Sequence, residues 1–240
     1  MTEEFYAPER VLVIVAHADD IEFGVSGTVA RWTEAGTQVT YVIVTDNSAG
    51  SNEPDADLDL LISTRKDEQL ASAAIVGVTD VRFLGYKDGT LQPTMALRRD
   101  LTRIIREVKP QIVLTMDPTM MISKSMGYIN HPDHRATGEA AMYAVFPSAG
   151  TRPIFPELLI EGYEPHNVEL LYFMLTNEPT HRIDISSTIE KKKEALRQHK
   201  SQLNDDVVEM VVKWDAETGK EIGADYAEIY RIVDFRPPAQ

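Results

Sequence analysis

The fold of this chain is decided by the stretch at residues 11–24, which reads VLVIVAHADDIEFG. Its first residues, Val11–Ala16, form an apolar run rich in β-branched side chains and without polar alternation, which is typical of a strand buried on both faces of a parallel sheet. The run ends at a histidine, followed after one alanine by two consecutive aspartates and then by a helical pattern. Since ligands of open parallel sheets bind outside the carboxyl ends of the strands, this turn is the first candidate for a functional site.

Strands and helices alternate along the first part of the chain. Short apolar runs predict strands, and helical periodicity follows each of them directly or after a loop. The expected strands are Arg10–Ala16, Val39–Thr45, Val81–Leu84 and Ile112–Met116, and the expected helices are Asp20–Ala35, Leu58–Val76, Pro93–Val108 and His131–Phe146. This order predicts an α/β fold, with a Rossmann-like doubly wound, mostly parallel sheet and helices on both of its faces.

The C-terminal part has a less regular pattern. We expect a strand at Val168–Leu175 and a helix that begins with a cap at Ser186–Thr188 and continues to about Gln202, whereas Asp215–Gly223 has the character of a hairpin turn. No repeat and no linker-like segment separates this part from the first. The sequence therefore predicts a single α/β domain over residues 1–240, with a catalytic core at about 10–147 and a C-terminal subregion at about 148–240.

Composition narrows the classes of protein to which the chain can belong. A net charge of −14 at pH 7 argues against a nucleic acid or an anionic membrane as partner. The absence of cysteine excludes disulfides and thiolate metal ligands, so a metal would need histidine and carboxylate ligands. The longest apolar run is too short to span a bilayer and follows an acidic N-terminus, so we expect a cytoplasmic protein. The composition leaves a homo-oligomer open.

The turn after the first strand predicts a metal site. The three-residue spacing of His17 and Asp20 around a tight strand-to-helix turn can aim an imidazole and a carboxylate at one point. His134, from another loop, would complete a set of two histidines and one carboxylate with an open position for water, which is typical of catalytic Zn²⁺. Bound Zn²⁺ would lower the pKa of that water to about 7, and Asp19 would take the proton of the water as general base.

A second motif, at residues 131–135, reads HPDHR and opens a helix. His131 could donate a hydrogen bond or a proton to a developing oxyanion or a leaving amine, and Asp133 could orient one of the histidines. Each motif alone has a plainer interpretation, because Asp19 and Asp20 could cap a helix and the second motif could be a capped helix start with an early proline. Their joint occurrence favours the metal site.

Other interpretations of the motifs fit less well. Gly24 and Gly27 after the first strand suggest a dinucleotide fingerprint, yet the turn would place carboxylates where a pyrophosphate should lie. The sequence has no Gly-x-Ser-x-Gly elbow and no P-loop. A nucleotide- or sugar-binding α/β module, whose acidic turn is merely a cap, stays as the alternative from a different class of protein.

Both motifs occur together in a known family. One family motif reads Ala-His-Pro-Asp-Asp, then Glu or Ile-Glu and a nearby glycine, and residues 16–24 of this chain read AHADDIEFG. The other family motif reads His-Pro-Asp-His-Arg-Ala and is present at residues 131–136. On these motifs the chain resembles the LmbE/PIG-L family of zinc-dependent de-N-acetylases. Shorter similarities lie at residues 44–46, 65–68, 83–89 and 199–202, so the resemblance covers about residues 10–202.

The resemblance implies a role for each polar residue of the two motifs. Asp19 would be the general base, and His131 would stabilise the tetrahedral intermediate with Asp133 behind it. The zinc ligands would be His17, Asp20 and His134.

Four further positions bear on the same site. In relatives that act on N-acetylglucosamine conjugates, the residues that match Arg65 and Asp88 contact substrate; a surface Arg–Glu helix pair and a turn aspartate before glycine are the plainer interpretations. Ala18 replaces the usual proline, so the turn loses a residue that fixes φ and the preorganisation of the ligands is in question. Tyr128 lies just before the second motif and receives no role.

The function implied is that of a zinc-dependent hydrolase. It would remove an N-acetyl group from an N-acetylglucosamine-type amino sugar or conjugate, a small molecule, and release acetate and a free amine. An amidase with the same site but another substrate, such as a thiol conjugate, is the alternative within this class. The segments that would choose the substrate, residues 119–130 and 147–167, carry no motif that we can interpret, although the first has the look of a loop over the site and contains Met120, Met121 and Met126.

Overall fold

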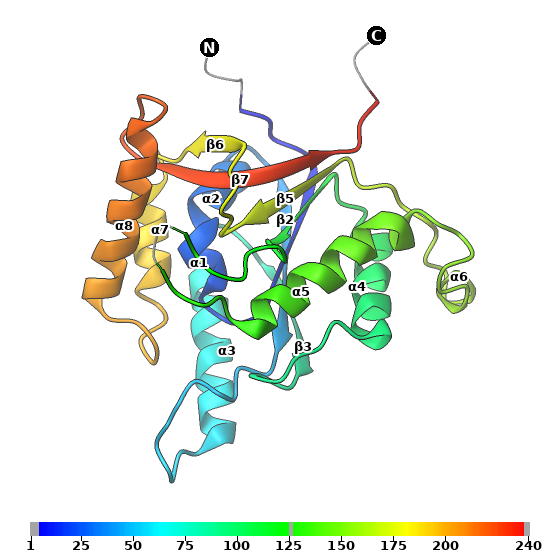
Figure 1. Ribbon diagram of the computed structural model, residues 1–240, viewed down its shortest axis with the longest axis horizontal. Coiled ribbons are helices and arrows are strands. Elements are labelled where there is room, and N and C mark those ends of the chain that lie inside the picture. Colours follow the sequence, from blue (N-terminus) through cyan, green and yellow to red (C-terminus); the bar gives the residue numbers. More distant parts are fainter. Residues whose placement is uncertain (1–4, 125–126, 238–240) are drawn as a thin grey trace.

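A seven-stranded sheet forms the centre of the computed structural model, which describes residues 5–124 and 127–237 (Figure 1). The strand order is β3-β2-β1-β4-β5-β7-β6; neighbouring strands from β3 to β5 are parallel, and β7 is antiparallel to both β5 and β6. The strands are β1 (Arg10–Val15), β2 (Gln38–Thr45), β3 (Asp80–Tyr86), β4 (Ile112–Met116), β5 (Leu170–Met174), β6 (His181–Asp184) and β7 (Ala227–Asp234). The predicted doubly wound α/β fold is confirmed.

Helices cover both faces of this sheet (Figure 1). One face carries α1 (Asp20–Gly24), α2 (Ser26–Glu34), α3 (Leu58–Ile75) and α7 (Ile189–Leu196), with α8 (Asp205–Lys220) packed outside α7. The other face carries α4 (Met95–Val108), α5 (Pro132–Tyr143) and the π-helical segment η1 (Ala144–Ala149); the short α6 (Glu157–Ile160) follows. Among residues 5–124 and 127–237, no helix has both the length and the apolar character needed to cross a membrane.

Strand β1 supplies side chains to both hydrophobic cores. Val11, Val13 and Val15 pack in the core beneath α2 and α7, whereas Leu12 and Ile14 pack in the core beneath α4 and α5. All five are fully buried, and burial of such a side chain contributes about 1.5–3 kcal/mol. The unbroken apolar run at residues 11–16 follows from this position in the middle of the sheet.

The expected helix at 20–35 is two helices. The backbone breaks at Val25, where φ is −147° and ψ is −4°, and α1 and α2 lie on either side of it. The break leaves the first amides of α2 without acceptors in their own helix. The amides of Gly27 and Thr28 donate instead to the carboxylate of Glu228, at 3.0 and 2.8 Å. A carboxylate from the last strand therefore completes the N-terminus of a helix near the start of the chain.

The C-terminal expectations were wrong in part. Most of Asp215–Gly223 belongs to α8, which begins after Asn204, whose side chain accepts a hydrogen bond from the amide of Val207. The helix expected to continue to about Gln202 ends at Leu196, and the strands β6 and β7 were not predicted. Met126, one of the three methionines of the predicted loop, lies outside the described residues.

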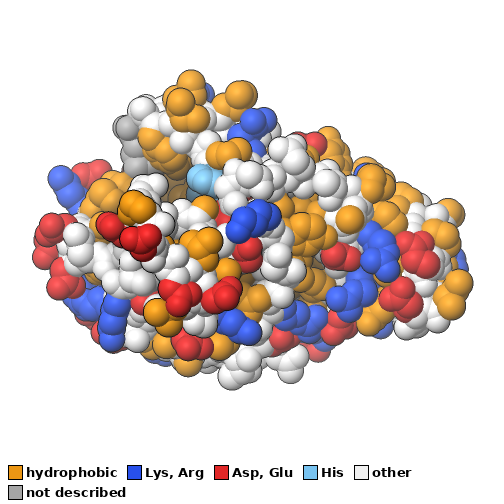
Figure 2. Space-filling model, turned by 90° about the horizontal axis from the view of Figure 1, so that it is seen from below, with side chains coloured by type: hydrophobic (Ala, Val, Ile, Leu, Met, Phe, Trp, Pro, Cys, Tyr) orange, Lys and Arg blue, Asp and Glu red, His pale blue; other side chains and the backbone are white. Residues whose placement is uncertain are grey.

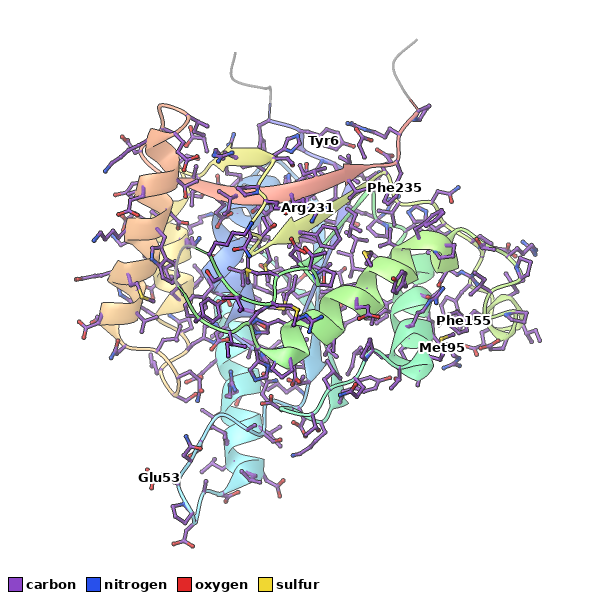
Figure 3. All side chains as sticks on the ribbon, viewed as in Figure 1. Tyr6, Glu53, Met95, Phe155, Arg231 and Phe235 are labelled. Atoms are coloured by element: carbon purple, nitrogen blue, oxygen red, sulfur yellow. The ribbon has the colours of Figure 1, made fainter. Side chains whose placement is uncertain are left out.

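A long loop precedes α3 and extends away from the sheet. Glu53, at the tip of this loop, stands clear of the body in Figure 3, whereas Tyr6 and Phe235 lie at the opposite end of the molecule. The residues of the predicted metal site follow the carboxyl ends of parallel strands, as His17 follows β1 and Asp88 follows β3.

Candidate metal centre

The two aspartate side chains in the turn after β1 do not make the hydrogen bonds of a helix cap. Asp19 occupies the N-cap position of α1 with φ of 92°, yet its side chain makes no capping hydrogen bond. Asp20 turns back toward the strand, and its Oδ2 accepts the amide of His17 at 2.7 Å. The interpretation of this aspartate pair as merely a helix cap is therefore not supported.

Imidazoles from the turn after β1 and from the first turn of α5 converge on Asp20. His134 Nε2 lies 3.1 Å from Asp20 Oδ1, and His17 Nδ1 lies 3.5 Å from Asp20 Oδ2. The rings of His17 and His134 are 5.3 Å apart at their centroids, and that of His131 is 4.8 Å from His17. Nitrogen atoms of these three histidines lie within 4.8 Å of one another, so that together they could hold a metal ion. The structure thus brings together all three predicted ligands, with His131 beside them.

Two further carboxylates lie behind His17. Its Nε2 is 3.1 Å from Asp88 Oδ1 and 3.5 Å from Asp133 Oδ2, and these residues form a second, overlapping group that could hold a metal. Asp133 is fully buried and accepts the amides of Gly89 and Leu91 at 2.7 and 3.1 Å. These bonds aim the Asp133 carboxylate at His17, while the Asp133 amide donates to His131 Nδ1 at 3.2 Å. The role of Asp133 behind His131 stays a prediction.

The charge balance of this cluster fits a divalent cation. Burial lowers the pKa of His17, but its close contacts with three carboxylates, first that of Asp133, outweigh burial and raise the pKa to about 12. Burial raises the pKa of Asp88, yet hydrogen bonding to His17 and to a backbone amide brings it to about 2. His17 Nε2 is buried and makes no well-aligned hydrogen bond. Imidazole and carboxylate donors that hold a positive charge in a buried site are a donor set for a metal such as zinc.

Asp19 has the environment of a general base. Burial and the neighbouring charge of Asp20 raise the pKa of Asp19 to about 7. Arg65 opposes this shift, with its Nη2 3.5 Å from Asp19 Oδ2, and the same nitrogen donates to the carbonyl of Ala18 at 2.9 Å. A base whose pKa lies near the working pH is best suited to proton transfer. Arg65 is only 6% exposed, so its interpretation as a surface ion pair is wrong.

His131 is held as a neutral donor. Its Nδ1 accepts the amide of Asp133 at 3.2 Å, which leaves the proton on Nε2. Burial and the positive charge of the adjacent His17 lower the pKa of His131. A neutral imidazole with its Nε2–H beside the metal ligands can donate a hydrogen bond to an oxyanion.

A buried network supports the turn from below, and few signs of it are visible in the sequence. Glu22 is fully buried and accepts hydrogen bonds from Ser72 at 2.7 Å and Gln69 at 3.2 Å, with His199 Nε2 3.1 Å away. Gln69 in turn accepts the amide of Asp19 at 3.1 Å. The only signals were the short family similarities around residues 65–68 and 199–202.

Open space lies beside α1, the short helix that follows the turn. Figure 2 shows a histidine side chain at the base of a hollow between hydrophobic side chains. A cavity of about 370 Å³ lies between Met120, Ser123 and Tyr128 on one side and α8 on the other, with Phe23 and Trp214 also among its walls. Burial and then the charge of Asp20 raise the pKa of Tyr128, one of the side chains that line this cavity.

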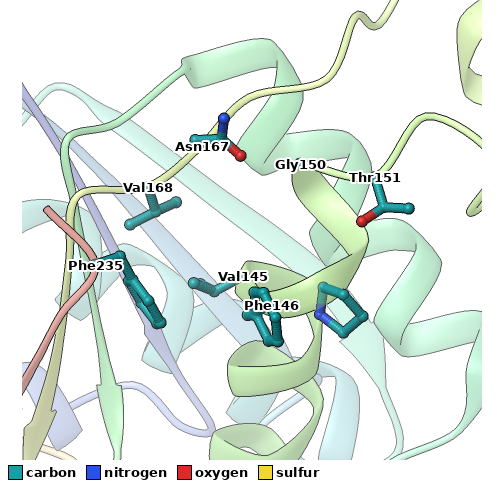
Figure 4. Close-up of a pocket in the computed structure, with 8 residues that line it drawn as sticks. Val145, Phe146, Gly150, Thr151, Asn167, Val168 and Phe235 are labelled. Atoms are coloured by element: carbon teal, nitrogen blue, oxygen red, sulfur yellow. The ribbon is translucent and has the colours of Figure 1, made fainter. Parts of the chain in front are cut away.

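A second cavity lies apart from the metal centre. It has a volume of about 370 Å³ and lies beside η1, where the rings of Phe146 and Phe235 stack 6.2 Å apart (Figure 4). Asn167 and Thr151 supply its polar atoms (Figure 4). None of the predicted site residues lines either cavity, but the first cavity borders Phe23 and Gly24 of α1, the helix that follows the turn, so we assign the chemistry to that side of the molecule.

A Rossmann-like sheet with this cluster of histidines and carboxylates defines a metal-dependent hydrolase of the α/β class. Residues 12–145 match the family model PIG-L, described as GlcNAc-PI de-N-acetylase, and the chain belongs to this family. This confirms the resemblance inferred from the two motifs.

Known relatives are similar over nearly the whole chain. Diacetylchitobiose deacetylase of Thermococcus kodakarensis is 33% identical over 97% of this chain and 86% of its own. A probable N-acetyl-alpha-D-glucosaminyl L-malate deacetylase 2 of Bacillus anthracis is 31% identical over 84% of each. The structure of N,N'-diacetylchitobiose deacetylase from Pyrococcus horikoshii superposes with a TM-score of 0.87 at 30% identity, covering 97% of this chain and 86% of that one.

Proposed function

We propose that the protein is a zinc-dependent deacetylase. It removes the acetyl group from an N-acetylglucosamine-type sugar or conjugate and releases acetate and a free amine. The observation that carries the proposal is the convergence of His17, Asp20 and His134 beside Asp19, a partly buried carboxylate whose pKa is raised to about 7. The named activities of the relatives support the same reaction.

The metal is assigned from the donor set. His17, Asp20 and His134 would hold Zn²⁺, and the carboxylates of Asp88 and Asp133 would orient His17 from behind. When bound, the ion acidifies a water molecule and polarises the amide carbonyl.

The residues of the chain move the protons. Asp19 accepts a proton from water, whose oxygen attacks the acetyl carbon. The Nε2–H of His131 then donates a hydrogen bond to the oxygen that becomes negative. Asp19 returns the proton to the sugar nitrogen as the carbon–nitrogen bond breaks, so the products are a carboxylic acid and an amine.

Arg65 and Asp88 remain the proposed contacts to the sugar. Both are buried: Arg65 donates to the Ala18 carbonyl, and Asp88 accepts the amide of Ala49 at 2.9 Å and lies 3.1 Å from His17 Nε2. These bonds fix the two charged groups in place, as a site for sugar hydroxyls requires. A cytoplasmic location stays a prediction.

The test combines metal content with release of acetate. We expect the purified protein to bind about one equivalent of zinc and to release acetate from diacetylchitobiose or from an N-acetylglucosaminyl conjugate such as the malate conjugate. Asp19→Ala should keep the metal and lose most turnover, whereas His17→Ala should lose both. Asp55→Ala, in the exposed loop before α3, serves as the matched control and should keep both. Full activity of Asp19→Ala, with equal metal content in all variants, would refute the assigned roles.

A further inference from the structure

Both backbone polar groups of Ala18, the N–H and the carbonyl, are hydrogen-bonded to buried side chains. Its N–H donates to Oδ1 of Asn47 at 2.7 Å, and its carbonyl accepts Nη2 of Arg65 at 2.9 Å. Ala18 itself is fully buried between the ligand His17 and the base Asp19. A proline at this position would have no N–H, so the bond to Asn47 exists only because residue 18 is not proline.

Asn47 is built into the end of β2 in a way that fixes the direction of its amide. Its Nδ2 donates to the carbonyl of Thr45 at 3.3 Å, which leaves Oδ1 facing Ala18. The amide and the hydroxyl of Thr45 both donate to the carbonyl of Ala16, at 3.0 and 2.9 Å. Asn47 therefore ties the metal turn to a strand end that is already bonded to β1.

The backbone of Asn47 supports the same conclusion. Its φ is 61°, in the left-handed region where asparagine is tolerated better than most residues. The side chain is only 2% exposed, so its polar atoms depend on protein partners. The strand end thus places a buried acceptor directly opposite the one amide that a proline would lack.

We propose that Asn47 is the positioning residue of the metal turn, and that its hydrogen bond to the Ala18 amide takes the place of the proline ring of the family motif. The bond fixes the peptide between His17 and Asp19, and with it the direction of the His17 and Asp20 side chains. This proposal rests on the proposed zinc site.

A comparison of four proteins tests whether the hydrogen bond from Ala18 to Asn47 does the work of the proline ring. The proteins are the wild type, Asn47→Gly, Ala18→Pro and the double variant; glycine removes the side chain and tolerates the positive φ. We expect Asn47→Gly to weaken zinc binding about tenfold or more, measured by competition with a chelator. In the Ala18→Pro background, Asn47→Gly should weaken zinc binding by less than about threefold, because residue 18 then has no N–H that needs an acceptor. The flexibility that glycine adds is equal in both backgrounds and cancels in the comparison.

Further measurements separate positioning from general stability. At saturating zinc, Asn47→Gly should keep the KM of the wild type, because Asn47 does not touch substrate. The matched control is Asn52→Ala, in the exposed loop before α3, which should keep the zinc affinity of the wild type. An equal loss of zinc affinity from Asn47→Gly in both backgrounds, or no loss in either, would overturn the proposal.

The outcome also distinguishes this proposal from the proposed function. If the wild type binds no zinc, the function fails, while the positioning role is still tested in the metal-free proteins. There, Asn47→Gly should lower the Tm more in the Ala18 background than in the Ala18→Pro background. Additive changes in Tm would show that the two positions are not coupled.

Discussion

Replacing Asp19 by asparagine separates the use of this side chain in proton transfer from its effect on the fold. Burial and the charge of Asp20 raise the pKa of Asp19 from 3.8 to about 7 in the metal-free protein. This rise corresponds to on the order of 4 kcal/mol between the two protonation states. Asparagine carries no charge and tolerates the φ of 92° at this position, so Asp19→Asn removes the unfavourable ionisation without new backbone strain.

The effect depends on pH in a defined direction. Below about pH 4 the carboxyl is neutral in both folded and unfolded chains, and above about pH 7 it is ionised in both. Between these values the folded protein binds more protons, so the stability of the wild type falls as the pH rises. The advantage of Asp19→Asn should therefore grow by about 2 kcal/mol between about pH 5.5 and about pH 8.

The assay is urea unfolding of the two metal-stripped proteins at both pH values. Zinc-loaded Asp19→Asn should show kcat lower by about 10²–10⁴-fold, the contribution of a general base. A pH-independent difference in the free energy of unfolding would refute the account of a desolvated carboxylate. A wild-type kcat for Asp19→Asn would refute its role in proton transfer.

Three further expectations concern the surroundings of the site. The Cβ of Gly138→Ala would clash with the carbonyl oxygen of Met116, so α5 should shift from β4, with a loss of about 1–3 kcal/mol in urea unfolding and weaker binding of zinc in chelator competition. Lys192→Met leaves two buried carboxylates, each 2.8 Å from the lysine nitrogen, without their cation, and should lower the free energy of unfolding by about 3–5 kcal/mol. Lys191→Met, at a half-exposed neighbour, should change it by less than about 1 kcal/mol, and equal losses for the two variants would contradict this argument. Removal of the metal should lower the Tm, and added zinc should restore it with a concentration dependence that gives the dissociation constant.

The central strands could be predicted because their position in the sheet requires a continuous run of apolar residues. A strand with helices on both faces needs apolar side chains in both directions, and β1, β2 and β4 have them. The edge strand β6 and its neighbour β7 are only partly buried, and their mixed polar sequences did not indicate strands. These pairings depend on tertiary context.

The turn expected at Asp215–Gly223 is mostly helix for a physical reason. Gly219 lies in the last part of α8, where a Cβ would be 2.7 Å from the backbone nitrogen of Tyr226. Close packing, not turn geometry, accounts for this glycine. Sequence periodicity alone cannot distinguish the two causes.

Within the site, residue types and strand ends were enough to predict which side chains meet. The partners that hold them were not predictable, because their contacts join distant positions through a few hydrogen bonds. Gln69 reaches Asp19 across 50 residues, and His199 reaches Glu22 across 177. In the sequence, Asn47 is one of several turn residues that follow the second strand, and no motif distinguishes it from its neighbours.

The carboxylate that completes the N-terminus of α2 has a consequence for biosynthesis. Glu228 lies 200 residues beyond Thr28, whose amide it accepts, and it also binds the buried nitrogen of Lys192. The helix that follows the metal turn thus lacks its acceptor until the ribosome has made almost the entire chain. A nascent chain that stops before β7 carries every proposed zinc ligand, yet the folded support beneath them comes only with its last strand.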